Sequence, residues 1–315
     1  MSTRKARLPQ LDGGLFLTDG GIETCLIFLD GLELPHFAAF HLLRTAEGRD
    51  ALRRYFERYL AIAAEGGHGF VLESPTWRAS ADWGARLGYA TEELAAANRD
   101  AIRLMAELRE AFAGRVSPIV VSGCIGPRGD GYDPGQVMTP EASEVYHAGQ
   151  IATFADAGAD MVTAITMTNT PESIGIVRAA GKGGMPVAIS FTLETDGRLP
   201  TGESLGQAIA AVDAATGGGP AYYMINCAHP THFADTLGQG GAWLKRVRGL
   251  RANASRRSHA ELNEAPDLDA GDPVELGGQY RDLVRRHPHI NVLGGCCGTD
   301  HRHIACIGEA CRAAA

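Results

Sequence analysis

Long apolar stretches and blocks of positive charge are both missing from this chain of 315 residues. No apolar run is long enough to cross a bilayer, and the basic residues 1–7 are not followed by the apolar core of a signal peptide. The net charge is −8 and aromatic residues make up only 7% of the chain, so basic patches and base-stacking side chains are scarce. The composition therefore argues against nucleic acids and membranes as partners.

Cysteine is sparse and follows no regular framework. The seven cysteines are odd in number and irregularly spaced, which does not suggest the paired bridges of a small secreted protein. We therefore expect free thiols in a reducing, cytoplasmic setting. The length allows either two domains or one large barrel, so the order of the elements has to decide between them.

Short β-branched, apolar runs alternate with longer segments of helical periodicity along the whole chain. The runs predict strands at residues 15–18, 70–73, 118–122, 161–166, 186–192, 222–226, 249–252 and 290–294. The intervening segments predict helices at residues 50–65, 91–113, 140–157, 171–180, 204–216, 232–246, 278–286 and 301–312. This alternation indicates an α/β fold, a single-domain (β/α)8 TIM barrel over residues 1–315. We expect residues 1–13 to form an N-terminal extension and residues 253–277 a long loop on the active-site face.

Two adjacent cysteines, Cys296 and Cys297, stand between glycines directly after the last predicted strand. Neighbouring side chains of a strand point to opposite faces, so the pair can meet one ion only where the backbone bends, and we assign that bend to the glycines. A catalytic zinc usually takes three protein ligands and leaves the fourth position open. Because Cys227 also ends an apolar run, we predict a Zn²⁺ site formed by Cys227, Cys296 and Cys297.

Other interpretations of the cysteines and histidines stay open at this point. Free cysteines are often small buried core residues, and a vicinal pair can be a redox couple. His229 and His232 are rival metal ligands. Because they lie two or more residues beyond the strand-end cysteine, we expect their side chains to point away from the metal and to surround the site without binding the ion. Packing roles are expected for the remaining cysteines, with the first two of them near the site: Cys25, Cys124, Cys306 and Cys311.

Four segments at the predicted strand ends together form a recognisable set of motifs. They are Thr18-Asp19-Gly20-Gly21-Ile22-Glu23-Thr24, Gly123-Cys124-Ile125-Gly126-Pro127, Asn226-Cys227, and Gly294-Gly295-Cys296-Cys297-Gly298-Thr299 followed by His303-Ile304. This set resembles the homocysteine S-methyltransferases, which include methylmethionine- and betaine-dependent enzymes and the homocysteine module of cobalamin-dependent methionine synthase. The resemblance spans about residues 14–311, and the double-cysteine motif is its most specific part.

The resemblance implies methyl transfer to homocysteine, which gives methionine, with zinc on the three cysteines. It also implies a pocket for the amino-acid thiol, in which the segment starting at Glu73 takes the place of a Glu-Thr-Asn-Thr-Phe pattern. The substrate-binding candidates are Asp19, Gly20, Gly21, Glu23, Glu73, Ser74, Trp77, Thr166 and Asn226.

One position departs from the family pattern. Family members usually carry a glutamate followed by threonine at the end of strand four, and that acid helps to hold the ammonium group of homocysteine. Here the acidic position is Ile165, and leaving an ammonium ion desolvated and unpaired costs several kcal/mol. Either another carboxylate replaces it, with Glu23, Glu73 or Glu194 as candidates, or the acceptor is not homocysteine. Glu23 is a second departure, because glycine is common at that position.

Three thiolate ligands suit alkyl transfer. Only a few per cent of a free thiol is ionised at neutral pH, whereas coordination to zinc deprotonates it, and three cysteinates keep the bound thiolate electron-rich. The methyl donor must be activated, as in a small onium compound such as S-methylmethionine, S-adenosylmethionine or betaine. Trp77 could attract such a cation with its ring face. A methylated corrinoid would need a partner protein, because a full barrel leaves no room for a second domain.

Three alternatives are weighed beside this function. The Ile165 departure favours a methyltransferase or demethylase of the same fold that uses a different thiol or selenol. A non-catalytic zinc- or thiol-binding barrel is the alternative of another class, and a fourth ligand from His229 or His232 would support it. Zinc-dependent hydrolysis is disfavoured, because no histidine-rich ligand set accompanies the cysteines. The partners expected are a small-molecule thiol and a methyl donor, and a homo-oligomer is left open.

Overall fold

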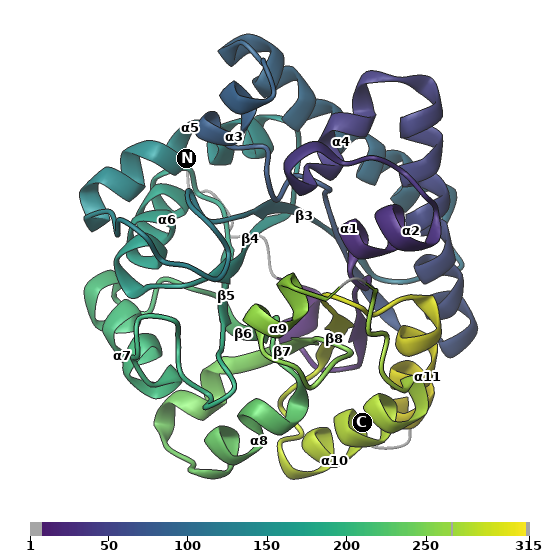
Figure 1. Cartoon of the computed structure of the whole chain (residues 1–315), viewed down its shortest axis with the longest axis vertical. Helices are drawn as coiled ribbons and strands as arrows, with labels where there is room; N and C mark the ends of the chain where they lie inside the picture. Colours follow the sequence, from purple (N-terminus) through teal and green to yellow (C-terminus); the bar gives the residue numbers. More distant parts are fainter. Residues whose placement is uncertain (1–7, 266, 313–315) are drawn as a thin grey trace.

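Eight parallel strands form a closed barrel in which each strand pairs with the next in sequence (Figure 1). The computed structural model describes residues 8–265 and 267–312. The strands are β1 (Phe16–Leu17), β2 (Gly69–Glu73), β3 (Ile119–Ile125), β4 (Met161–Met167), β5 (Val187–Thr192), β6 (Tyr222–Asn226), β7 (Val247–Ala252) and β8 (Val292–Gly295). The pairs Phe16–Val292 and Leu17–Leu293 join β1 to β8 and close the ring. The predicted single-domain (β/α)8 barrel is confirmed.

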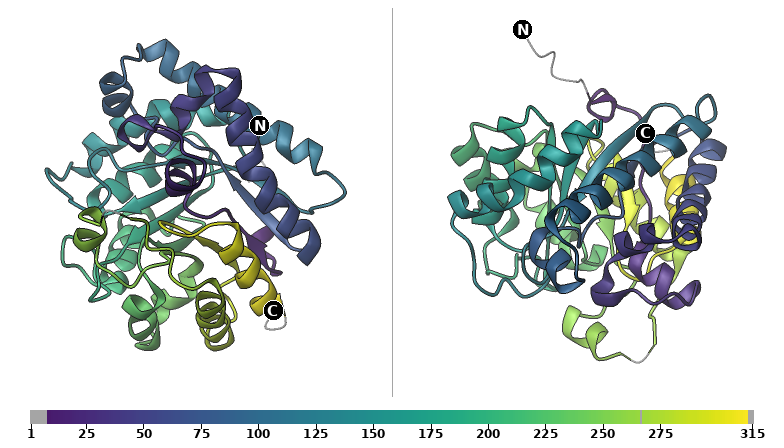
Figure 2. Two further views of the ribbon diagram at one scale, coloured as in Figure 1. Left: turned by 45° about the vertical axis from the view of Figure 1, so that its right-hand side comes forward. Right: turned by 90° about the horizontal axis from the view of Figure 1, so that it is seen from above.

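Helices surround the barrel, as Figures 1 and 2 show. The longer ones are α2 (Ala46–Gly66), α4 (Thr91–Ala111), α5 (Pro140–Asp156), α6 (Thr170–Lys182), α7 (Leu205–Thr216), α8 (Pro230–Gly238), α10 (Pro273–Arg286) and α11 (His301–Arg312). Short helical segments fill the connections: η1 (Pro9–Leu11), α1 (Ile22–Thr24), η2 (Cys25–Leu29), η3 (Pro35–Phe37), η4 (Ala39–Arg44), α3 (Ala81–Arg86), η5 (Ala242–Arg246) and α9 (His259–Asn263). None of the helices within the described ranges has both the length and the apolar composition needed to cross a membrane.

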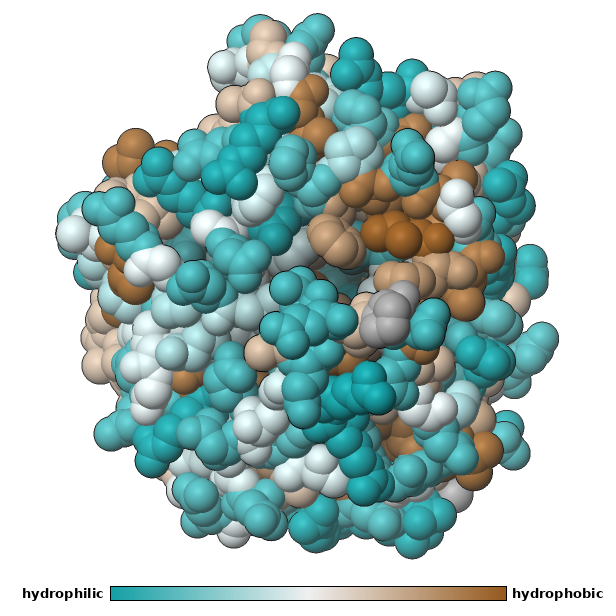
Figure 3. Space-filling model, viewed as in Figure 1, coloured by the Kyte–Doolittle hydropathy of each residue, from teal (hydrophilic) through white to brown (hydrophobic). Residues whose placement is uncertain are grey.

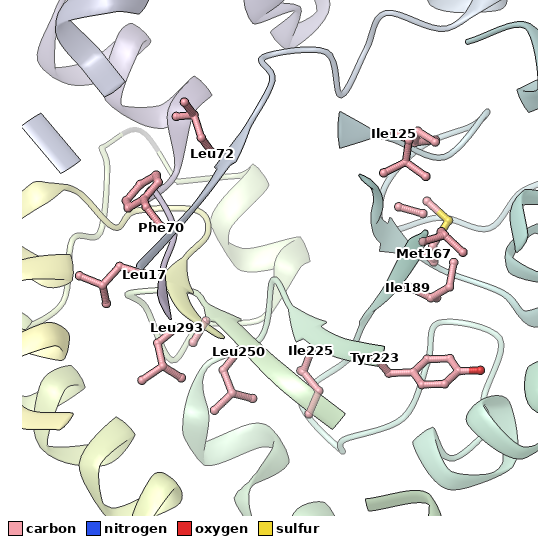
Figure 4. Packing of buried hydrophobic residues seen from close by; sticks show 14 of the residues in the cluster. Leu17, Phe70, Leu72, Ile125, Met167, Ile189, Tyr223, Ile225, Leu250 and Leu293 are labelled. Carbon is pink, nitrogen blue, oxygen red and sulfur yellow. The ribbon is translucent and has the colours of Figure 1, made fainter. Parts of the chain in front are cut away.

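The strand side chains alternate between two apolar regions. Residues on the outer face, such as Leu72, Ile189 and Leu250, pack in the large core between barrel and helices (Figure 4). Inward residues at one end of the barrel form a second, smaller cluster: Phe16, Val71, Val120, Met161, Ala188, Tyr222, Met224 and Val292. Two residues further along the strands, the inward positions become polar, with Glu73, Ser122, Thr163, Ser190 and Asn226. The barrel therefore has an apolar floor and a polar layer above it.

The N-terminal extension closes that floor. Residues 1–7 of the predicted extension lie outside the described residues, but Leu8 is buried in the inner cluster. The buried Gln10 amide donates to Met161 Sδ at 3.2 Å and to the Tyr222 hydroxyl at 3.4 Å. Figure 2 shows the N-terminal segment at one end of the barrel and α9 at the other. The open end of the barrel is therefore the one at which the strands terminate.

Two boundaries predicted from periodicity are wrong. The helix expected at 232–246 is α8 followed by η5, because Gly240 and Gly241 have φ values of 72° and 117° that end the first helix. The segment expected as a loop at 253–277 contains α9 and the first turn of α10. Ser258 caps α9, and Asp272 caps α10 by accepting from the amides of Val274 and Glu275.

Candidate functional site

Three cysteine sulfurs converge at the C-terminal ends of two strands. Cys227 follows β6, and Cys296 and Cys297 follow β8. Their sulfur atoms all lie within 4.8 Å of one another, with Cys227 buried and the other two half-buried. The strand between them holds both segments in place, because Cys227 N donates to Arg251 O at 3.2 Å and Cys296 N to Ala252 O at 2.8 Å. The cluster is consistent with a metal site.

The donor set of this cluster fits a soft metal ion. Contact with the Cys296 sulfur raises the pKa of Cys227, contact with Cys227 raises that of Cys297, and burial adds to both. Three thiolates this close together repel one another unless a cation lies between them. Tetrahedral zinc accepts such a set and keeps a fourth position for another ligand. The residues present therefore suit the ion that the sequence predicts.

The backbone at Cys227 is in the left-handed region, with φ at 54°, and Thr166 at the end of β4 has φ of 64°. Such values are uncommon for residues other than glycine and need support from their surroundings. Asn226 gives that support to Thr166: its Oδ1 accepts from Thr166 N at 3.1 Å, and its Nδ2 donates to Thr166 Oγ1 at 2.9 Å. Asn226 is fully buried below the cavity and also accepts from Ser190. It therefore lies one layer deeper than a substrate-binding residue would.

The glycines beside the double cysteine act differently from what the sequence suggested. Gly294 and Gly295 belong to β8 and have no positive φ; only Gly298, with φ of 78°, makes the turn. A Cβ at Gly294 would overlap Thr18 Oγ1 and lie 2.9 Å from Asp19 O. A Cβ at Gly21 would lie 2.5 Å from Cys296 O. These glycines therefore permit the β1 and β8 strand ends to touch.

Substituting Gly294 with alanine is expected to destabilise the fold by about 1–3 kcal/mol, because overpacking displaces the Thr18–Asp19 backbone. Urea unfolding measures this difference. Gly278→Ala is the matched control, since a Cβ there has no neighbour within 4 Å and the helix interior favours alanine. Equal stability of Gly294→Ala and the wild type would contradict the close approach.

A cavity of about 770 Å³ opens above the three sulfurs. Eight of the nine substrate-binding candidates line it, Asn226 being the exception: Asp19, Gly20, Gly21, Glu23, Glu73, Ser74, Trp77 and Thr166. Part of segment 253–277 also lines it, including His259 and Leu262, so the long connection after β7 does lie on this face. Figure 3 shows apolar side chains gathered beside the central hollow, near α1. Phe28 and Phe37 are exposed and line the cavity.

The floor of the cavity is a buried ion cluster that sequence reasoning missed. The guanidinium of Arg251 donates from Nη2 to Asp19 Oδ1 at 2.7 Å and from Nη1 to the Glu73 carboxylate. It also donates to Gly295 O at 3.0 Å, and the Tyr55 hydroxyl donates to Asp19 Oδ2 at 3.0 Å. All three charged side chains are less than a tenth exposed. Asp19 and Glu73 are therefore largely committed to Arg251.

Tyr132 forms part of the roof. Its hydroxyl lies 3.3 Å from Cys297 Sγ and 3.7 Å from Cys227 Sγ, and its ring stacks on His259 with centroids 4.0 Å apart. Burial and the neighbouring sulfurs raise the pKa of Tyr132, so the hydroxyl keeps its proton. Burial lowers the pKa of His259 to about 4, so the imidazole is neutral. The β3–α5 connection and α9 thus meet directly above the cysteines.

The cavity wall also distinguishes the three carboxylates that could replace the acid missing at Ile165. Ile165 lines the cavity and offers no charge. Glu23, on α1, lines it too, and desolvation, reinforced by Asp19, raises the pKa of Glu23 to about 7. Glu194 is half-buried at the lining, and desolvation raises its pKa as well. Of the three carboxylates considered from the sequence, Glu73 is the one bound by Arg251.

The other cysteines and the two histidines lie outside the sulfur cluster. Cys124 is buried and lines the cavity, whereas Cys25 donates to Thr299 O at 3.3 Å. His232 Nε2 lies 2.9 Å from Arg256 O, and His229 Nδ1 lies 2.8 Å from Thr231 Oγ1. Cys306 and Cys311 are on α11. Among the described residues, the histidines thus have other partners than a metal.

Comparison with known proteins agrees with this site. The model of the homocysteine S-methyltransferase family matches residues 16–311. Among solved structures, the homocysteine methyltransferase MmuM from Escherichia coli is similar in its metallated form, with a TM-score of 0.72, 19% identity, and coverage of 97% of this chain and 99% of that chain. Its oxidized form has a TM-score of 0.71 at 20% identity, covering 94% and 95% of the two chains. Its apo form has a TM-score of 0.66 at 19% identity, with coverage of 98% of this chain and 100% of that chain. No curated protein matches significantly. Because the family model covers nearly the whole barrel, including all three converging cysteines, this chain belongs to the homocysteine S-methyltransferase family.

Proposed function

We propose that this protein is a zinc-dependent S-methyltransferase that moves a methyl group from a small onium donor to homocysteine and so forms methionine. The observation that carries the proposal is the convergence of three cysteine sulfurs at the base of a cavity of about 770 Å³. Membership of the family and the metallated form of a similar methyltransferase support it.

In this proposal Cys227, Cys296 and Cys297 hold zinc, which when bound supplies an acidic centre that keeps the incoming thiol ionised. The chain's own residues orient the thiol. Asn226 holds Thr166 in its left-handed conformation, and Arg251 fixes Asp19 at the cavity floor. Ser74 is tied to β3 by accepting from Cys124 N at 3.0 Å.

The onium donor would approach from the mouth of the cavity. Its positive charge favours aromatic neighbours, which Trp77 and Tyr132 provide in the lining. One face of Trp77 is occupied by the Arg78 guanidinium, whose central carbon lies 3.9 Å from the ring centroid. A donor cation would therefore use the opposite face of Trp77.

An assay with metal exchange tests the function. The purified protein, supplied with homocysteine and in turn S-methylmethionine, S-adenosylmethionine or betaine, is expected to form methionine with at least one donor. Removing zinc with a chelator should abolish turnover, and adding zinc back should restore it, since the thiol alone is mostly protonated at neutral pH. Full activity in a zinc-free preparation would contradict the proposal.

The isoleucine at position 165 favours one second candidate, in which the same chemistry acts on another thiol or a selenol. The wall that would neutralise an ammonium ion in the family is apolar here. A panel of thiols tested with one active donor separates the two functions. Turnover of another acceptor with none of homocysteine would select the second candidate.

A further inference from the structure

Arg78 is a buried cation at the wall of the cavity. It follows β2, and its side chain is 6% exposed. The central guanidinium carbon lies 3.9 Å from the ring centroid of Trp77 and 3.8 Å from that of Trp83, so two indoles clamp the planar group from both faces. Such stacking leaves the N–H edge of the guanidinium as its only route to polar partners. The clamp therefore fixes the direction in which Arg78 can bind.

The N–H edge of Arg78 is not fully used within the described chain. Nη1 donates to Gly129 O at 2.9 Å, and Nη2 lies 3.8 Å from Asp130 Oδ2, whose side chain is half exposed. The Nε atom is buried without a hydrogen-bond partner. Burial lowers the pKa of Arg78 to about 10, which still leaves it charged at neutral pH. Nε is closed to solvent, so a ligand can reach the guanidinium only through its Nη atoms, of which Nη2 makes no hydrogen bond among the described residues.

Arg78 lines the same cavity as the three sulfurs, and a series of contacts connects the two parts of the wall. A Cβ at Gly131 would lie 3.0 Å from both Trp77 Cζ2 and Thr166 Cγ2, so these side chains flank the Gly131 backbone. Thr166 Oγ1 lies 4.0 Å from Cys227 Sγ. Tyr132, the residue after Gly131, places its hydroxyl 3.3 Å from Cys297 Sγ. One cavity therefore gives access both to the three sulfurs and to Arg78.

A carboxyl of opposite charge faces the same space. Glu23 lines the cavity from α1, and Glu23 and Arg78 attract each other electrostatically. Unlike Asp19 and Glu73, which the Arg251 guanidinium binds, Glu23 is in no ion pair of the described residues closer than 4.0 Å. The cavity therefore presents the Arg78 cation and the Glu23 carboxyl in one space.

We propose that Arg78 binds the carboxylate of an α-amino-acid thiol and that Glu23 binds its ammonium group, with the sulfur directed at the three cysteines. The inference rests on the proposed function and specifies how its acceptor is recognised. A zwitterionic head group satisfies the free N–H edge of Arg78 and the carboxyl of Glu23 at once. Glu23 would thereby supply the carboxyl that the apolar wall at Ile165 lacks. Arg78 is thereby a specificity-determining residue that the family resemblance does not supply.

Binding of three thiols to the zinc-loaded protein, without any methyl donor, tests the inference by isothermal titration calorimetry. The probes are homocysteine, 3-aminopropane-1-thiol, which lacks the carboxylate, and 4-sulfanylbutanoate, which lacks the ammonium group. Arg78→Met is expected to weaken homocysteine and 4-sulfanylbutanoate by about 10- to 100-fold and to leave 3-aminopropane-1-thiol within about twofold. Glu23→Gln is expected to give the converse pattern, weakening homocysteine and 3-aminopropane-1-thiol only.

Arg86→Met is the matched control. Arg86 stacks on Trp83, with its guanidinium carbon 4.3 Å from the centroid, but it is exposed and does not line the cavity. It should leave all three affinities unchanged. If Arg78→Met fails to fold, Arg78→Lys keeps the charge, and weaker binding confined to the two carboxylate-bearing thiols supports the same assignment.

The outcomes separate the inference from the function on which it rests. If the wild type binds the thiols and the Arg78 variants weaken all three equally, or none, the head-group assignment is wrong while the proposed function stands. If the zinc-loaded wild type binds none of the three thiols, the proposed function itself is contradicted, and the inference with it.

Discussion

Replacing Cys296 with alanine is expected to lower the affinity for zinc by more than about 100-fold and to abolish methyl transfer. Loss of a residue that merely supports a metal ligand typically costs 10- to 100-fold in affinity, so the loss of one of three ligands should cost more. The remaining two sulfurs, on Cys227 and Cys297, cannot complete the tetrahedral set. Metal content after dialysis and methionine formation measure the two effects.

Cys306→Ala is the control for this experiment. Cys306 is a half-exposed cysteine on α11 and does not belong to the sulfur cluster, so zinc content and activity should equal those of the wild type. Both variants are expected to keep the barrel, which circular dichroism verifies. A Cys296→Ala protein with full zinc content would contradict the assignment of the metal site.

Replacing Arg251 with methionine is expected to lower the free energy of unfolding by about 3–5 kcal/mol. The substitution removes the guanidinium that binds Asp19 and Glu73, and it leaves two carboxylates buried without a counter-charge. Removing one partner of a buried pair is costly because the other charge cannot regain water. Urea unfolding at neutral pH measures the difference.

Two further variants define the cause of that loss. Arg248 lies on the same strand, but within the described ranges its side chain makes only long hydrogen bonds of 3.4 Å, to Gln10 O and Asn291 Oδ1, so the effect of Arg248→Met should stay below about 1 kcal/mol. Combining Arg251→Met with Asp19→Asn and Glu73→Gln should recover part of the lost stability by removing the stranded charges. No recovery in the triple variant would show that packing rather than charge dominates.

Periodicity and the direction of the strands made the barrel predictable. Each apolar run was followed by a helical segment, and a parallel barrel brings the C-terminal ends of all its strands to one face. This is why Cys227 and Cys296 could be expected to meet although they are far apart in the chain. The prediction needed no side-chain detail, since only the strand ends mattered.

The ion cluster at the cavity floor was not predictable in the same way. Arg251 stands in a strand between the apolar residues Leu250 and Ala252, so the local pattern indicates a buried strand rather than a charged site. Its partners are Asp19, which follows β1, and Glu73, which ends β2, and they are 232 and 178 residues away in sequence. The available signal was a charged residue at an inward position of a predicted buried strand, which requires a counter-charge.

The glycines show a second limit of sequence reasoning. A glycine can mark either a turn or a close approach of two backbones, and the sequence pattern around the double cysteine favoured a turn. The structure assigns close approach to Gly294 and the turn to Gly298. The difference lies in tertiary neighbours such as Thr18, which a local pattern does not contain.

The two strands that carry the cysteines are not neighbours in the barrel, since β7 lies between β6 and β8. Strands two places apart are separated by about 9.5 Å, yet the sulfur atoms of Cys227 and Cys296 lie within 4.8 Å of each other. An ion held there would cross-link the ends of β6 and β8 across β7, which contributes no ligand of its own. Loss of the ion should therefore loosen this sector of the rim, and local hydrogen exchange would rise there before the rest of the molecule changes.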